Sequence, residues 1–161
     1  MDIAHIDNLI SDKYRVGKNG KYILEEKTKS EFPKTKLIHK GMQLLYKFDE
    51  DKKLLPFFKD VEGAKSMSDY VVFIINKNNL FVFIIELSKT RKKYNQYEPT
   101  RLFVDYILKT CERLNKCSLS AIFKYILITK KVYKRNTKVK NEDSYNTHAG
   151  EDLDLSIYCI A

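Results

Sequence analysis

The fold of this chain is decided by residues 69–89, which read DYVVFIINKNNLFVFIIELSK. Two apolar runs, residues 70–75 and 80–85, flank the polar segment 76–79. Runs rich in β-branched and aromatic residues on either side of a short polar turn are typical of a β-hairpin. Because each run is apolar at consecutive positions, we expect both strands to be buried on both faces.

An acidic residue stands at the outer end of each run: Asp69 precedes the first and Glu86 follows the second. Pairing through the turn brings the start of the first strand beside the end of the second, so we expect both carboxylates at one edge of a sheet. In a chain of net charge +9, such a pair indicates a divalent cation that works on a polyanion. Taken singly, Asp69 can instead cap a turn and Glu86 can pair with a nearby lysine.

The composition predicts a folded, basic, soluble protein. The 161 residues are 43% hydrophobic, and 30 Lys and Arg stand against 21 Asp and Glu, so we expect one domain with a nucleic-acid partner, DNA rather than RNA. A solvated basic surface is the alternative. No signal-peptide pattern is visible, and no apolar run approaches the roughly 20 residues that cross a bilayer. We therefore expect a cytoplasmic protein with no membrane partner, and leave open a homodimer or larger complex.

Other reactive residues form no recognisable site. The three cysteines lack metal-ligand spacing and are expected to be free thiols, and the three histidines are scattered. No phosphate-binding glycine loop, zinc pattern or nucleophile elbow appears. Kinase, dehydrogenase and serine-hydrolase activities are therefore unsupported.

The remaining segments predict a mixture of helices and strands. Apolar spacing predicts a first helix over residues 3–14, and Pro33 opens a second helix that reaches Tyr46. The strongest helix begins at Pro99, and its expected apolar stripe is Leu102, Phe103, Tyr106, Ile107, Thr110, Cys111 and Leu114. A buried strand over residues 122–129 follows this helix, which predicts a parallel pair with the second hairpin strand.

We therefore expect an α/β fold (an α+β mixed sheet) with a central mixed sheet of four to five strands flanked by helices. The expected organisation is a single domain, 1–161. Its parts are a helical N-terminal part (1–60), an αβ core (65–130), a basic loop (130–150) and a terminal strand (153–160).

Residues 68–73 and 84–89 together resemble the signature of the PD-(D/E)XK, or restriction-endonuclease-like, nuclease superfamily. In that superfamily a core of helix, three strands, helix and strand places an Asp at the start of the second strand. An acid, any residue and Lys then end the third strand. The resemblance covers residues 65–130 and implies a restriction-endonuclease-like core in which Asp69 and Glu86 bind Mg2+ or Mn2+. It also implies supporting roles for Tyr94 and Gln96, which precede the second core helix.

The resemblance departs at position 88, where the superfamily has Lys and this chain has Ser88. Lys89 follows one residue later and faces the other side of a regular strand. Three routes would restore the missing function: a bulge at residues 87–88 that turns Lys89 into the site, a lysine from elsewhere such as Lys65 or Lys92, or activation of water by the metal alone. We keep Lys89 as a catalytic candidate and Ser88 as a supporting one.

Two further groups complete the candidate site. A third acid is left open among Glu25, Glu26 and Glu31. Basic residues after the last core strand are expected to contact phosphates; they are Lys130, Lys131, Lys134, Arg135, Lys138 and Lys140.

Three functions follow from these observations. The first is a Mg2+-dependent nuclease, an endonuclease or phosphodiesterase that hydrolyses DNA in a defence, toxin or repair system. The second is a catalytically decayed protein of the same fold that acts as a nucleic-acid-binding or interaction subunit. The third is an unrelated basic α/β interaction protein.

Overall fold

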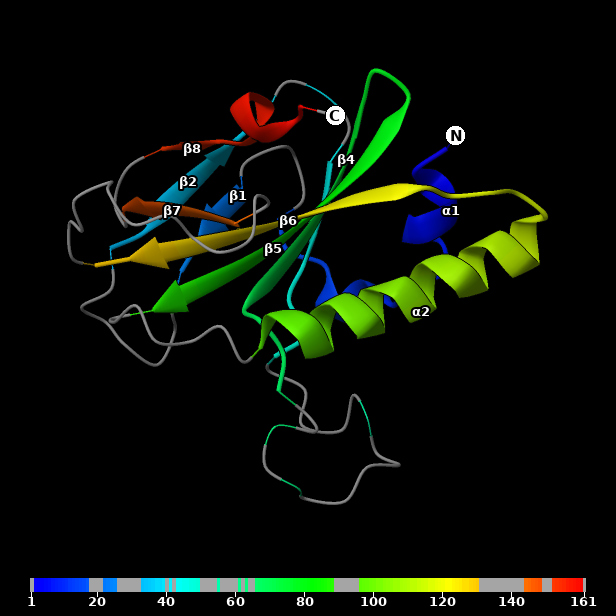
Figure 1. Cartoon of the computed structure of the whole chain (residues 1–161), viewed down its shortest axis with the longest axis horizontal. Coiled ribbons are helices and arrows are strands. Elements are labelled where there is room, and N and C mark those ends of the chain that lie inside the picture. The colour runs from blue at the N-terminus through cyan, green and yellow to red at the C-terminus, as the bar shows by residue number, and fades with distance from the viewer. Residues whose placement is uncertain are drawn as a thin grey trace.

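The computed structural model describes residues 2–17, 22–25, 33–39, 41, 43–49, 55, 61, 63, 66–88, 96–130, 144–148 and 152–160, with residues 144–148 described by their backbone alone. The largest element is a five-stranded mixed sheet in the order β3-β4-β5-β6-β7. Its strands are β3 (Gln43–Tyr46), β4 (Tyr70–Asn76), β5 (Asn79–Ser88), β6 (Ala121–Thr129) and β7 (Ser144–His148). The pairs β3–β4 and β4–β5 are antiparallel, whereas β5–β6 and β6–β7 are parallel (Figure 1).

The predicted hairpin is confirmed as β4 and β5. The register runs from Tyr70↔Ile85 to Asn76↔Asn79, and Lys77 and Asn78 form the two-residue turn with φ of 48° and 68°. Two left-handed residues give a turn whose twist matches that of the strands, and asparagine tolerates this conformation better than most residues. The strands are buried through their middles on both faces, as expected.

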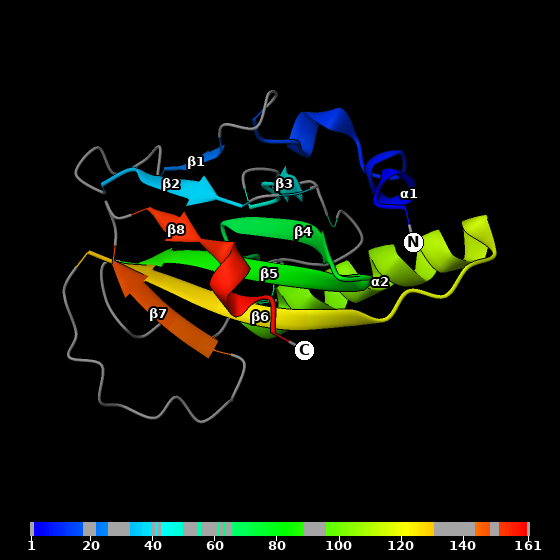
Figure 2. The same ribbon diagram turned by 90° about the horizontal axis from the view of Figure 1, so that it is seen from above.

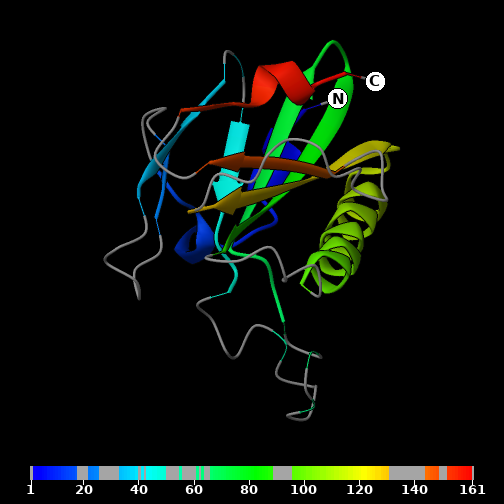
Figure 3. The same cartoon turned by 60° about the vertical axis from the view of Figure 1, so that its left-hand side comes forward.

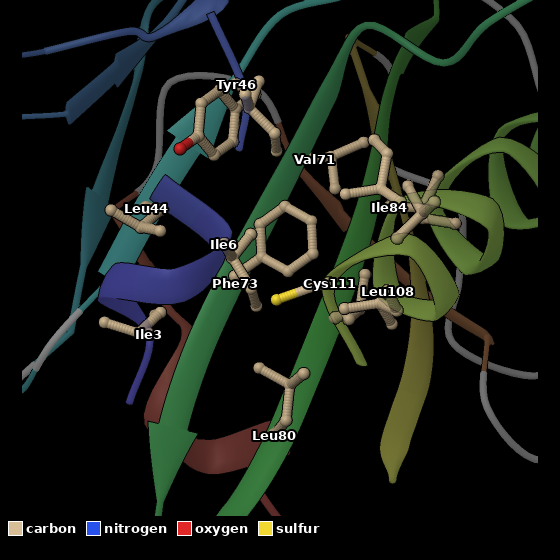
Figure 4. Close-up of a cluster of buried hydrophobic side chains, with 14 of the residues drawn as sticks. Ile3, Ile6, Leu44, Tyr46, Val71, Phe73, Leu80, Ile84, Leu108 and Cys111 are labelled. Atoms are coloured by element: carbon tan, nitrogen blue, oxygen red, sulfur yellow. The ribbon is translucent and has the colours of Figure 1, made fainter. Parts of the chain in front are cut away.

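One face of this sheet is covered by α2 (Tyr97–Asn115) and the short α1 (Ala4–Asp7). The alternate strand residues on this face, which include Val71, Phe73 and Ile84, pack against the helices in one apolar cluster. Figure 4 shows Leu108 and Cys111 of α2 and Ile6 of α1 converging on these strand side chains. α2 connects β5 to β6, and these two strands pair in parallel, which confirms the predicted parallel pair.

The other face is covered by a three-stranded sheet in the order β1-β2-β8. Its strands are β1 (Tyr22–Leu24), β2 (Thr35–Ile38) and β8 (Leu153–Asp154), and the 3-10 helix η2 (Leu155–Tyr158) continues from β8. Leu24, Leu37 and Leu153 belong to a second apolar cluster, whose members from β4 and β5 include Tyr70, Val72, Phe81, Phe83, Ile85 and Leu87. Figures 2 and 3 show the helices and the small sheet on opposite sides of the large one.

The expected helix from Pro33 to Tyr46 is wrong, because this segment forms β2 and β3. Thr35 and Leu37 are buried while Lys36 between them is exposed, which is the alternation of a strand. Gly41, with φ of 146°, separates the two strands in a backbone conformation that other residues rarely adopt. The described residues of the expected helical N-terminal part (1–60) therefore include the strands β1, β2 and β3, and a small sheet rather than helices covers the second face.

Four smaller expectations also need correction. The helix over residues 3–14 is two short pieces, α1 and the 3-10 helix η1 (Asp12–Tyr14). The terminal strand over 153–160 is only two residues long before η2 begins, and β7 lies inside the expected basic loop (130–150). The buried face of α2 is Thr100, Val104, Ile107, Leu108 and Cys111, whereas Leu102, Tyr106 and Leu114 of the predicted stripe are exposed.

Candidate metal and catalytic site

Asp69 directly precedes β4 and Glu86 lies near the end of β5, so both stand at the open end of the hairpin. The paired register ends at Tyr70↔Ile85, and Asp69 and Glu86 are the next residue outward on each side. Strand alternation puts Glu86 on the face of β5 that packs against α2, since Ile84 belongs to the cluster on that side. The backbone N–H of Leu87 donates to Oδ2 of Asp69 at 2.5 Å. The hairpin thus holds the first carboxylate directly beside the strand that carries the second.

Glu86 is held by Gln96, the residue that precedes the first turn of α2. The Glu86 side chain is buried, with 2% of the residue exposed. An ionised carboxylate only accepts hydrogen bonds, so the Gln96 amide nitrogen must face it. In that orientation the nitrogen donates to Oε1 at 2.5 Å and to Oε2 at 2.8 Å. A donor shared by both oxygens of this buried carboxylate fixes its position and compensates its removal from water.

Thr100, one turn into α2, ties this helix to the strand that carries Asp69. Its Oγ1 donates to the carbonyl oxygen of Gln96 at 2.7 Å and accepts from the backbone N–H of Ser68 at 2.7 Å. Thr100 is completely buried and Ser68 is 1% exposed. Figure 1 shows the start of α2 beside the start of β4. Sequence analysis missed Thr100, although its place four residues after Gln96 puts both on one side of a helix.

Position 88 holds a buried hydroxyl on the same face as Glu86. Ser88 is 5% exposed and pairs in register with Thr129 of β6. The register of β5 with β6 is uninterrupted through residues 86–88, whereas a bulge would set two residues opposite one. The suggested bulge at 87–88 is therefore wrong. Leu87 points into the cluster on the other face, as strand alternation requires.

Of the basic candidates, the structure describes Lys130 alone. It is exposed and immediately follows the end of β6, so it lies at the same end of the β5–β6 pair as Glu86. Lys65, Lys89, Lys92 and Tyr94 lie outside the described residues, as do Lys131, Lys134, Arg135, Lys138 and Lys140.

The third acid is not supplied by Glu25. Tyr70, whose side chain faces away from the Asp69 side, donates from its hydroxyl to the Glu25 carbonyl at 2.7 Å and accepts from the Glu25 N–H at 3.0 Å. The Glu25 carboxylate pairs with Lys34 at 2.9 Å. Glu26 and Glu31 lie outside the described residues.

Electrostatics at this edge also involve Tyr70 and residues that follow β3. Burial raises the pKa of the Tyr70 hydroxyl, the nearby charges of Asp69 and Asp49 raise it further, and Lys47 opposes them. The Lys47 ammonium lies over the Tyr70 ring, 5.1 Å from its centroid. Lys47 thus packs against the Tyr70 ring.

The donor set is compatible with Mg2+, which proteins bind through one or two carboxylates with water completing the shell. Within the described residues, no group of three or more His, Cys, Asp and Glu side chains is placed to hold a metal together. The described residues offer a cation at this edge the two carboxylates of Asp69 and Glu86.

The chain matches no protein-family model, no curated protein and no solved structure. Among the helices that the structure describes, none is both long enough and apolar enough to cross a membrane.

Proposed function

We propose that this protein is a Mg2+-dependent nuclease with a restriction-endonuclease-like core. The observation that supports the proposal is that the Asp69 carboxylate accepts from the backbone N–H of Leu87, the residue next to Glu86. The two carboxylates are held from different directions, one by the Leu87 amide and the other by Gln96. Such support keeps metal-binding oxygens in place before the cation arrives.

The order of elements supports the same proposal. Leaving out η1, β1 and β2, the chain runs α1, β3, β4, β5, α2 and β6, which is the helix, three strands, helix and strand order of the superfamily core. Asp69 precedes the second of these strands and Glu86 lies near the end of the third. The β1-β2-β8 sheet would then be an addition to the core.

Each residue has a defined task in the proposed reaction. A Mg2+ ion bound here would lower the pKa of a water molecule and offset negative charge on the phosphodiester. Asp69 and Glu86 supply the oxygen ligands, and Gln96 keeps Glu86 from turning away. Lys130, exposed at the same end of the sheet, attracts the phosphate backbone. With no bulge at residues 87–88, the lysine of the reaction would come from elsewhere, such as Lys65 or Lys92, or the metal alone would activate the water.

The proposed substrate is DNA in preference to RNA. The net charge of +9 favours a polyanion through release of its counterions. We place the enzyme among defence, toxin or repair nucleases, and a homodimer or larger complex is part of the proposal.

A plasmid-nicking assay with Mg2+ or Mn2+ tests the function. We expect metal-dependent cleavage by the wild-type chain and none by Asp69→Asn or Glu86→Gln. Glu98→Gln is the matched control, because Glu98 is an exposed acid in the first turn of α2 that pairs with Arg101. Cleavage that survives both site substitutions would overturn the proposal.

The second candidate is a decayed site on the same fold. The observation that favours it is Ser88, which the unbroken register fixes beside Glu86 where the superfamily has its lysine. Tight, salt-sensitive DNA binding without cleavage would support this candidate. Cleavage gained by Ser88→Lys would show that only the amine is missing.

A further inference from the structure

We infer that Thr100 is a positioning residue for the Asp69–Glu86 pair and sets how strongly the site binds its metal. This inference rests on the function proposed above. Thr100 touches neither carboxylate. It acts through the backbone groups on either side of its hydroxyl, those of Ser68 and Gln96.

The hydrogen bonds form a closed path around the site. Thr100 holds the N–H of Ser68, the residue before Asp69. Asp69 in turn accepts from the N–H of Leu87, the residue after Glu86. Gln96 donates to Glu86 and its own carbonyl accepts from Thr100. The two carboxylates are therefore connected by two routes. One runs from Asp69 through the Leu87 amide to Glu86. The other runs through Ser68, Thr100 and Gln96.

Within this path, the Thr100 hydroxyl joins α2 to the segment that contains Asp69 and leads into β4. It is both donor and acceptor, which a threonine side chain can be and a valine of nearly the same shape cannot. Thr100 and Ser68 are buried at 0% and 1% exposure, so water does not replace a lost bond there. Without the hydroxyl, the Ser68 amide loses its acceptor and the segment before Asp69 can shift relative to Gln96.

The expected effect falls on metal binding before it falls on turnover. Loss of a group that orients metal ligands typically weakens metal affinity or activity by 10- to 100-fold. We expect Thr100→Val to raise the half-saturating Mg2+ concentration for cleavage by at least about tenfold, with a smaller change in the rate at saturating Mg2+. Thr100→Ser keeps the hydroxyl and should retain the wild-type requirement.

The test measures cleavage rate against Mg2+ concentration, and Mn2+ binding by calorimetry, for the wild type, Thr100→Val and Thr100→Ser. Thr35→Val is the matched control, because Thr35 is a fully buried threonine in β2 on the opposite side of the large sheet. We expect it to lower stability without changing the metal requirement. A metal requirement in Thr100→Val equal to that of the wild type would overturn the inference.

A double substitution separates positioning from general destabilisation. If Thr100 acts through Gln96, then Thr100→Val combined with Gln96→Ala should weaken metal binding by less than the product of the single effects. Effects that multiply fully would overturn the inference.

If Thr100→Val fails to fold, hydrogen exchange of backbone amides in the wild type tests the inference instead. The Ser68 and Leu87 amides should open together if they belong to one path, and unrelated exchange rates would overturn it. A wild type without metal-dependent cleavage would overturn the proposed function itself. A wild type that cleaves and a Thr100→Val variant with an unaltered metal requirement would remove only the role of Thr100.

Discussion

Replacing Asp69 by alanine and by asparagine separates its structural contribution from its proposed chemical one. Oδ2 of Asp69 accepts from the Leu87 N–H at 2.5 Å, and Leu87 is 3% exposed. Alanine leaves that buried N–H without an acceptor, which costs about 1–3 kcal/mol. Asparagine retains an oxygen at the same place and should keep most of the stability.

The corresponding shift in melting temperature can be worked out from the size of the chain. For a domain of this length, 1 kcal/mol corresponds to roughly 2–4 °C. We therefore expect Asp69→Ala to melt roughly 2–12 °C below the wild type, and Asp69→Asn to remain close to it. Circular dichroism melts and urea unfolding at one pH measure this difference.

Activity should order the two variants differently. If Asp69 is a metal ligand, both substitutions abolish Mg2+-dependent cleavage, because neutral asparagine removes the charge that attracts the cation. If Asp69 only caps the end of the hairpin, Asp69→Asn should be as active as the wild type. An active, stable Asp69→Asn variant would refute the metal-binding assignment, and equal melting temperatures for both variants would refute the Leu87 contact.

Three further outcomes are expected. Leu108→Ala should lower the free energy of unfolding in urea by roughly 2–5 kcal/mol, since Leu108 is 2% exposed. Leu102→Ala, on the exposed side of α2, should change it by no more than about 0.5 kcal/mol. Equal losses of stability would contradict the observed helix face. The Tyr46 hydroxyl donates to Asp7 at 2.7 Å, and burial raises its pKa far above the ordinary 10.0. Its contribution to stability is therefore complete below pH 10.0 and declines as the pH rises further, and Tyr46→Phe should make the unfolding free energy less dependent on alkaline pH. Asn78→Val should cost about 1–2 kcal/mol because position 78 has φ of 68°, and Asn78→Gly, which should not, is its control.

The hairpin and the carboxylate pair were predictable because their signals are local. The runs around the Asn76–Asn79 turn are apolar on both faces, and a two-residue turn fixes the register of every pair beyond it. The expectation that Asp69 and Glu86 share one edge of the sheet follows from that register alone. The position of Gln96 was also predictable, because this residue lies directly before the helix that follows β5.

The small sheet was not predictable for the opposite reason. β2 is four residues long, and Leu37 and Ile38 fit a helix or a strand equally well over so short a span. What selects the strand is pairing with β1 on one side and with Leu153 and Asp154 on the other. The sequence of β2 alone does not show that this strand pairs with Leu153 and Asp154, more than a hundred residues later in the chain.

The buried face of α2 was misjudged because aromatic and aliphatic residues surround the helix. The apolar spacing predicts that Leu102 and Tyr106 lie in the core, whereas the helix turns Thr100 and Val104 toward the sheet. Thr100 passed unnoticed since a threonine in a first helical turn reads as an ordinary polar residue. Its partner Ser68 lies on another element, and only the folded chain brings the two together.

The parallel pairing of β2 with β8 has a consequence for how the chain matures during synthesis. Leu37 and Leu153 are neighbours in the small sheet, so the ribosome must add well over a hundred residues between making the first and making the second. Until the later one emerges, the apolar side of the large sheet lacks part of its cover and is open to proteases and to other nascent chains. Contacts so distant along the chain also slow folding, so shortening the chain before residue 153 should yield a protein that aggregates rather than one that is merely less active.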